Sequence, residues 1–157
     1  MANKTQWLTS TDYFEGLLYD GADARALILD MLSNRSPCSK LARNVTSFFG
    51  EDLRLSTYPD AAYSSVYTYT VDDKVHIRLG LASDRVMESL VHELLHLELL
   101  REGFPRLDIH DTPQNRDAFH SHYGLFNYLQ HEVMYPMYVS LGLGSSRFLA
   151  EVPSKGV

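Results

Sequence analysis

The sequence has little of three features that would point to other kinds of protein. Its single cysteine, Cys38, excludes an internal disulfide and is typical of a reducing compartment. Acidic residues outnumber basic ones by 20 to 14, and the resulting net charge of -6 argues against a nucleic-acid partner. No apolar run approaches the roughly 20 residues of a membrane-spanning helix. We therefore expect a cytoplasmic protein with neither a nucleic-acid nor a membrane partner.

Internal repeats and low-complexity linkers are also missing, which favours one domain over residues 1–157. The start is polar and has no apolar core region behind it, so we expect no secretory signal. Residues 1–10 and 145–157 have the composition of loose ends. The hydrophobic share of 45% is enough for a real core.

Apolar periodicity and turn residues predict four helices and three strands. The predicted helices span residues 11 or 12 to about 32 with an interruption near Asp20-Gly21, 39–49 with Gly50 as the stop, 83–103, and about 114–138 with Pro136 ending or kinking the last. The predicted strands span residues 53–57, 66–71 and 74–79.

The last strand alternates strictly, with polar Lys74, His76 and Arg78 set against apolar Val75, Ile77 and Leu79. This alternation predicts one packed face and one solvated, charged face.

Within the helix predicted at 83–103, His92-Glu93-Leu94-Leu95-His96 forms the pattern H-E-x-x-H. Residues four apart lie on one face of a helix, so the imidazoles of His92 and His96 can reach a single tetrahedral ion. Glu93 lies about 100° around the helix, which suits a base that takes a proton from a metal-activated water. Zinc-dependent hydrolases hold their metal with this pattern.

The residues around the motif place it in the interior. Ser83 is a suitable N-cap with Asp84 in the first turn, and Gly103 followed by Pro105 is a stop signal. Apolar residues surround most of the helix between these ends, which predicts burial on nearly all sides. Buried histidines need partners, and a metal ion would supply one.

This order of elements resembles the catalytic core of the zincin metallopeptidases, and compact SprT-like and ImmA/IrrE-like members are nearest in size and layout. The resemblance rests on residues 66–79 followed by 83–103, with the H-E-x-x-H pattern as its one strongly specific motif. It implies an α+β fold, a minimal zincin-like domain in which a small antiparallel or mixed sheet packs against the motif helix and further helices. It also implies that a peptide binds by β-addition along the strand before that helix, residues 74–79.

Zinc needs a third protein ligand and an open position for water. A metzincin ligand is excluded, because Leu99 and Glu102 stand where that pattern needs Gly and His. We prefer His131, because it belongs to a polar stripe along one face of the last predicted helix. The stripe consists of His120, Asn127, His131 and Tyr135.

Other third ligands stay open at this point. Glu132 would be the gluzincin-like choice, although it faces about 100° away from His131. His110 follows His96 at a spacing like that of SprT-like proteins, but on a loop. His120 and His122 complete the set.

The leading hypothesis is a zinc metallopeptidase acting on a protein or peptide, with one Zn²⁺ per chain held by His92, His96 and His131. Glu93 would be the general base, and Tyr135 would donate a hydrogen bond to the oxyanion. The alternative is a metal-stabilised protein-binding or regulatory module with little or no turnover. An intact Glu93 argues against that alternative, because a purely structural site needs no base.

Overall fold

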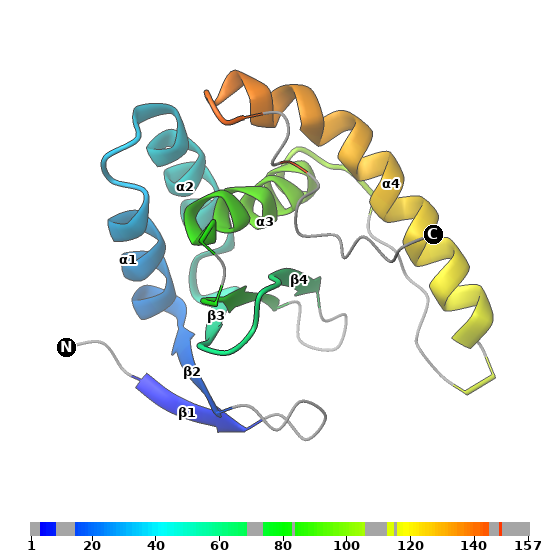
Figure 1. Cartoon of the computed structure of the whole chain (residues 1–157), viewed down its shortest axis with the longest axis horizontal. Helices are drawn as coiled ribbons and strands as arrows, with labels where there is room; N and C mark the ends of the chain where they lie inside the picture. The colour runs from blue at the N-terminus through cyan, green and yellow to red at the C-terminus, as the bar shows by residue number, and fades with distance from the viewer. Residues whose placement is uncertain are drawn as a thin grey trace.

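In this computed structural model, helices cover one face of a mixed sheet (Figure 1). The structure describes residues 4–8, 15–68, 74–82, 84–105, 113–114, 116–144 and 148, with the backbone alone for 4–8, 15–17, 67–68, 119–120 and 123. The elements are β1 (Lys4–Leu8), β2 (Glu15–Asp20), α1 (Gly21–Met31), α2 (Ser36–Phe49), the 3-10 turn η1 (Gly50–Asp52), β3 (Leu53–Tyr58), β4 (Ser65–Thr68), β5 (Val75–Gly80), α3 (Val86–Arg101) and α4 (Arg116–Ser140). The α+β class is as predicted.

The strands lie in the order β1-β2-β3-β5-β4. β3 and β5 are parallel, with Leu55 opposite Ile77, while β4 runs antiparallel to β5 with Val66 opposite Ile77. β5 is therefore an interior strand. The expectation that residues 74–79 form a free edge for a peptide is wrong, because both sides of β5 are already hydrogen-bonded to strands.

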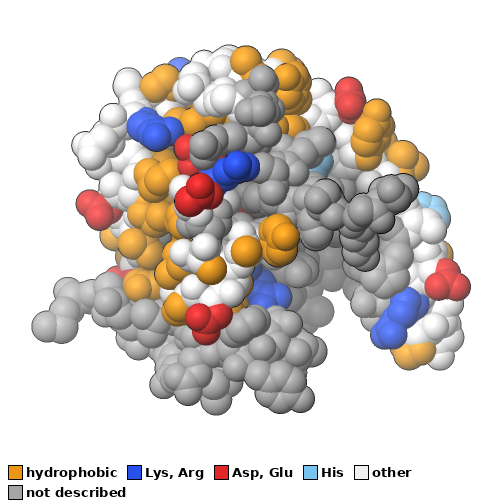
Figure 2. Space-filling model, in the orientation of Figure 1, with side chains coloured by type: hydrophobic (Ala, Val, Ile, Leu, Met, Phe, Trp, Pro, Cys, Tyr) orange, Lys and Arg blue, Asp and Glu red, His pale blue; other side chains and the backbone are white. Residues whose placement is uncertain are grey.

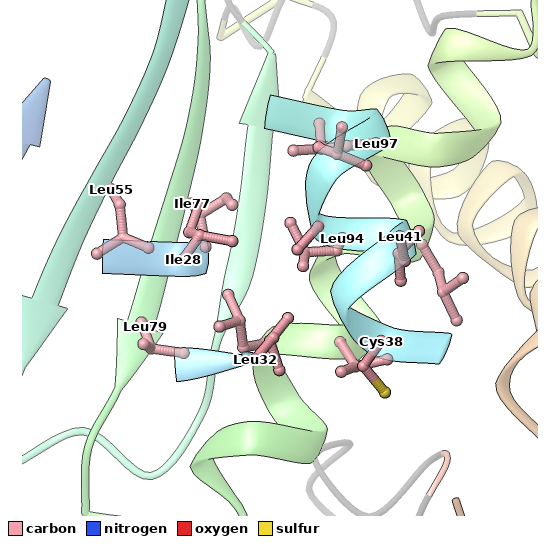
Figure 3. Packing of buried hydrophobic residues seen from close by; sticks show 14 of the residues in the cluster. Ile28, Leu32, Cys38, Leu41, Leu55, Ile77, Leu79, Leu94 and Leu97 are labelled. Carbon is pink, nitrogen blue, oxygen red and sulfur yellow. The ribbon is translucent and has the colours of Figure 1, made fainter. Parts of the chain in front are cut away.

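A single apolar cluster joins this sheet to α1, α2 and α3. Figure 3 shows Leu55 and Ile77 of the sheet close to Ile28 of α1, with Leu41 of α2 and Leu94 of α3 in the same cluster. All five side chains are buried. Burying each such side chain contributes about 1.5–3 kcal/mol, so this face of the sheet holds α3 firmly in place.

α3 is buried along most of its length, as the sequence predicts. Every residue from Ser89 to Leu99 is buried, because α3 contacts α2 and α4 as well as the sheet. The helix begins later than predicted, at Val86, with Arg85 rather than Ser83 in the N-cap position. Ser83 itself lies outside the described residues.

α4 crosses α3 and extends well beyond it (Figure 1). Gln130, Met134 and Tyr138 are its buried residues among those with described side chains, and their spacing of four places them on one face. Pro136 lies within the helix, which continues to Ser140, two residues beyond the predicted end near residue 138, so of the two predicted effects of Pro136 the ending of the helix is wrong. Several large apolar side chains of α4 are exposed, and hydrophobic surface is visible over this helix in Figure 2. They are Leu125, Tyr128, Leu129, Val133, Tyr135 and Val139.

The first third of the chain differs most from its prediction. Residues 15–20, expected to begin a helix, form strand β2, in which Tyr19 is buried and pairs with Leu55. The break near Asp20-Gly21 is real: Gly21 has φ 49°, and a Cβ there would collide with the carboxylate of Glu51. Residues 4–8, expected to be loose, form β1 against β2. A short apolar run fits either a strand or a helix, and here sheet pairing decides.

The far face of the sheet is polar, but it is not solvated as the alternation predicts. His76 is 4% exposed and Ser56 is 0% exposed, and the His76 Nε2 lies 2.8 Å from the Ser56 Oγ. The Arg78 guanidinium lies 4.7 Å from the centre of the Tyr58 ring. Burial lowers the pKa of His76 to about 4, and the charges of Arg78 and Arg54 act in the same direction.

We predict that His76 makes the fold sensitive to acid. The pKa of His76 in the folded protein lies below the ordinary 6.5, so protons bind this residue more readily in the unfolded chain. The folded state therefore keeps its full stability above pH 6.5 and loses stability as the pH falls towards about 4. Between pH 7 and pH 5 this loss amounts to about 2 kcal/mol in the free energy of unfolding. Urea titrations of the metal-free protein at several pH values should show a weaker pH dependence for His76→Gln than for the wild type. The exposed His122→Gln should behave as wild type, and an identical pH dependence in His76→Gln would contradict the assignment.

Candidate metal centre

α3 places the two histidines of the motif side by side. The ring centroids of His92 and His96 lie 5.2 Å apart, as expected for residues one turn apart on a helix. The two side chains are 6% and 7% exposed, and Glu93 between them is 4% exposed. Three polar side chains of one helix are thus buried, where each one requires a partner.

α4 brings in the third histidine. The Nε2 atoms of His92 and His131 lie 3.1 Å apart, and the ring centroids of His96 and His131 lie 5.2 Å apart. One ligand atom from each of the three side chains falls within 4.8 Å of the other two. The prediction that His131 joins the motif histidines is confirmed.

The spacing of these nitrogens fits a metal ion. Two nitrogens that each lie ~2.0–2.1 Å from a tetrahedral zinc are about 3.3 Å apart. The 3.1 Å between His92 and His131 is close to that value. The same distance also permits an N–H···N hydrogen bond between two neutral rings. The convergence of a third imidazole, from His96, favours the metal.

The environment keeps these imidazoles neutral, which is the form that binds a metal. Burial, with a smaller contribution from the neighbouring His96 and His131, lowers the pKa of His92 to about 3. Burial likewise lowers the pKa of His96 to about 4, with His131 acting in the same direction. The pKa of His131 is also lowered by burial. Competition from protons is therefore weak at neutral pH.

Gln130, which the sequence analysis did not single out, orients His96. It is 7% exposed, and its Oε1 lies 2.9 Å from the His96 Nδ1. Because an amide oxygen only accepts, the Nδ1 of His96 must donate, which leaves its Nε2 lone pair free for a metal. The Nδ1 of His92 has no partner at hydrogen-bonding geometry among the described residues. The main chain of Phe148 acts to raise the pKa of His92, against the larger effect of burial.

Two of the other candidate ligands, Glu132 and His122, do not join this group. Glu132 is exposed on α4, and His122 is exposed with its Nδ1 2.7 Å from the carbonyl oxygen of Ala118. His120 lies on α4, but its side chain is not described, and His110 lies outside the described residues. Among the described side chains, His131 is therefore the third ligand that the geometry supports.

Tyr135 lies one turn beyond His131 and is 44% exposed. Its ring contacts Phe148, a second residue that the sequence analysis missed, at a centroid distance of 5.4 Å. Phe148 belongs to the segment expected to be loose, yet it is 3% exposed. Its ring also lies 5.0 Å from that of His92. The histidine cluster thus has an aromatic wall on this side.

Comparison with known protein families, curated proteins and solved structures finds no significant match. Among the described residues, no helix combines the length and the apolar character needed to cross a membrane. The chemistry of the site must therefore be judged from its own geometry: two buried imidazoles and one half-buried imidazole that can hold a metal ion.

We predict that metal binding depends on all three histidines. Replacing His92, His96 or His131 by alanine should abolish stoichiometric zinc binding, because each removes one of the three nitrogens that converge among the described side chains. Metal analysis after dialysis, with affinity measured against a competing chelator, provides the test. Glu132→Ala and His122→Ala on the same helix are the matched controls and should bind zinc as wild type does. Normal binding by His131→Ala together with loss in Glu132→Ala would make Glu132 the ligand instead.

A second prediction concerns Gln130. Gln130→Leu removes the acceptor that fixes the His96 ring, so zinc affinity should fall by roughly 10–100-fold without being lost. Gln130→Glu restores an acceptor and should recover most of that affinity. Met134→Leu, a buried neighbour one turn further along α4, should change the affinity little. An unchanged affinity in Gln130→Leu would show that the hydrogen bond has no role in metal binding.

Proposed function

We propose that this chain is a zinc-dependent metallopeptidase of the zincin type. The observation that carries the proposal is the meeting of His131 from α4 with the two histidines of a buried H-E-x-x-H helix. In catalytic zinc sites three protein ligands leave the fourth position to water or substrate, whereas structural sites have four protein ligands. A group of three imidazoles next to a glutamate fits the catalytic arrangement.

Zinc is the metal that this donor set suits best, because neutral imidazoles match its preference and three of them fit a tetrahedral site. Zinc held there would supply the Lewis acidity that activates water at neutral pH and polarises a carbonyl group. The protein supplies the rest. Gln130 fixes the ring of His96, and the apolar surroundings of α3 exclude bulk water and strengthen electrostatic interactions at the site.

Glu93 is the residue we assign as general base. It follows His92 directly, so it leaves the helix about 100° from the ligand face. In peptide hydrolysis its carboxylate would take a proton from the attacking water and pass it to the leaving amine. Glu93 is 4% exposed, so bulk solvent has little access to its carboxylate. Tyr135 remains a proposed donor to the oxyanion.

A peptide substrate would pair with β4 rather than with β5. β4 (Ser65–Thr68) is the strand at this end of the sheet, next to β5, and it contacts α3, which carries the motif. An extended peptide added to that strand would run alongside the motif helix, with backbone hydrogen bonds providing affinity. The sequence analysis assigned peptide binding to residues 74–79, and we now assign it to the neighbouring strand β4.

We predict that Glu93→Gln retains the fold and the metal but loses hydrolysis. The amide is nearly isosteric with the carboxylate and cannot accept the proton, so kcat should fall by about 10²–10⁴-fold. Zinc content, the circular dichroism spectrum and turnover of a mixed peptide library together make the test. Glu98→Gln, at a buried glutamate of the same helix that pairs with Arg101, is the matched control and should keep turnover. Wild-type protein that binds zinc and cleaves no peptide would support the alternative, a metal-stabilised binding module.

A further inference from the structure

Phe148 lies against the histidine cluster although it follows α4 in the chain. Its ring centroid is 5.0 Å from that of His92 and 5.4 Å from that of His131. The rings of Tyr135 and Tyr138, both on α4, lie 5.4 Å and 5.1 Å away. We call the space bounded by these four rings the aromatic niche. Phe148 fills it, since only 3% of its surface is exposed.

Phe148 lies against Tyr135 as well as against two of the candidate metal ligands. It makes edge-to-face contacts with both Tyr135 and His131, with interplanar angles of 72° and 73°. No ring contact among the described residues joins Tyr135 directly to His131 or His92. A ligand that approaches a metal from the side of Tyr135 would therefore need the space that the Phe148 ring occupies.

The walls of the niche indicate which ligand group it suits. Four aromatic or imidazole rings offer edges and faces that favour another aromatic ring at centroid separations of about 4.5–7 Å. The Phe148 ring meets all four walls within that range. Its own contacts thus show how an aromatic side chain would sit there.

We propose that the aromatic niche is a binding subsite for an aromatic side chain of a ligand, and that Phe148 occupies it as an intramolecular competitor. The inference rests on the metal site of the proposed function. When the Phe148 ring is in place the protein is autoinhibited, and a ligand binds only from the fraction of molecules in which the ring has left. The apparent affinity for an aromatic ligand is reduced by that fraction. Burial of one aromatic ring corresponds to a reduction on the order of tenfold to a hundredfold.

The test uses two zinc-chelating probes that need no turnover, phenylalanine hydroxamate and acetohydroxamate, with the full zinc-loaded chain. Both bear the same chelating group, but only the first carries an aromatic ring. In the wild type, phenylalanine hydroxamate should bind no more tightly than acetohydroxamate. In Phe148→Ala its affinity should rise by at least about tenfold, while that for acetohydroxamate should change by less than about threefold.

Leu143→Ala is the matched control, because Leu143 also follows α4 and is buried at 7% exposure but makes no ring contact with the cluster. It should leave both affinities as in the wild type. If Phe148→Ala does not fold, as judged by circular dichroism, Phe148→Leu replaces it and should give a gain of about threefold for phenylalanine hydroxamate alone.

Unchanged affinities in the Phe148 variants, or an equal gain for both probes, would overturn the inference and leave the metal site intact. A gain in affinity for phenylalanine hydroxamate alone, in a protein that cleaves no peptide, would support the aromatic niche and contradict the proposed peptidase function. A wild type that binds no zinc would overturn both.

Discussion

The crossing of α4 over α3 holds imidazole nitrogens of His92 and His131, residues far apart in the chain, 3.1 Å from each other. That approach depends on the buried face of α4, where Gln130, Met134 and Tyr138 are enclosed. α3 in turn is fixed from the opposite side by the apolar cluster that joins it to α2 and the sheet. The core therefore sets the distance between ligands, and a shift of α4 by a fraction of a helical turn would separate them.

Local patterns predicted the half of the site that lies on one helix. Once this segment forms a helix, His92 and His96 lie on one face and can act as a pair of ligands. Once the apolar residues around them pack into a core, the pair is buried. The same reasoning worked for α2, β3 and the class of the fold. It failed where a short apolar run is compatible with either a helix or a strand. Residues 15–20 pair with β3, and this sheet pairing outweighs their helical pattern.

The second half of the site depends on tertiary structure, which explains why the alternatives could not be resolved from sequence. His131 was preferable to Glu132 only through a stripe of polar residues, and the direction of that stripe becomes known once α4 is seen to pack on α3. Gln130 shows the limit of that reasoning. Its signal was the spacing Gln130, Met134 and Tyr138 on one helical face, but a buried glutamine is recognised only when its partner, His96, is in place. Phe148 gave no signal at all, because its contacts are entirely non-local.

Two polar clusters flank different faces of this small sheet, and they are satisfied in different ways. On the far face a hydrogen bond joins His76 to Ser56, so these two buried side chains are partners within the protein. Beside α3, three imidazoles converge with their nitrogens, and Gln130 settles the tautomer of His96. A hydrogen bond between His92 and His131 can pair two of these three nitrogens, but the third lacks a partner within this group, and burying it carries a penalty in the metal-free fold. A metal that binds the folded chain and not the unfolded one would remove this penalty and add stability in proportion to the logarithm of its concentration. The folding of α4 onto α3 and the binding of a metal would then be coupled, each favouring the other.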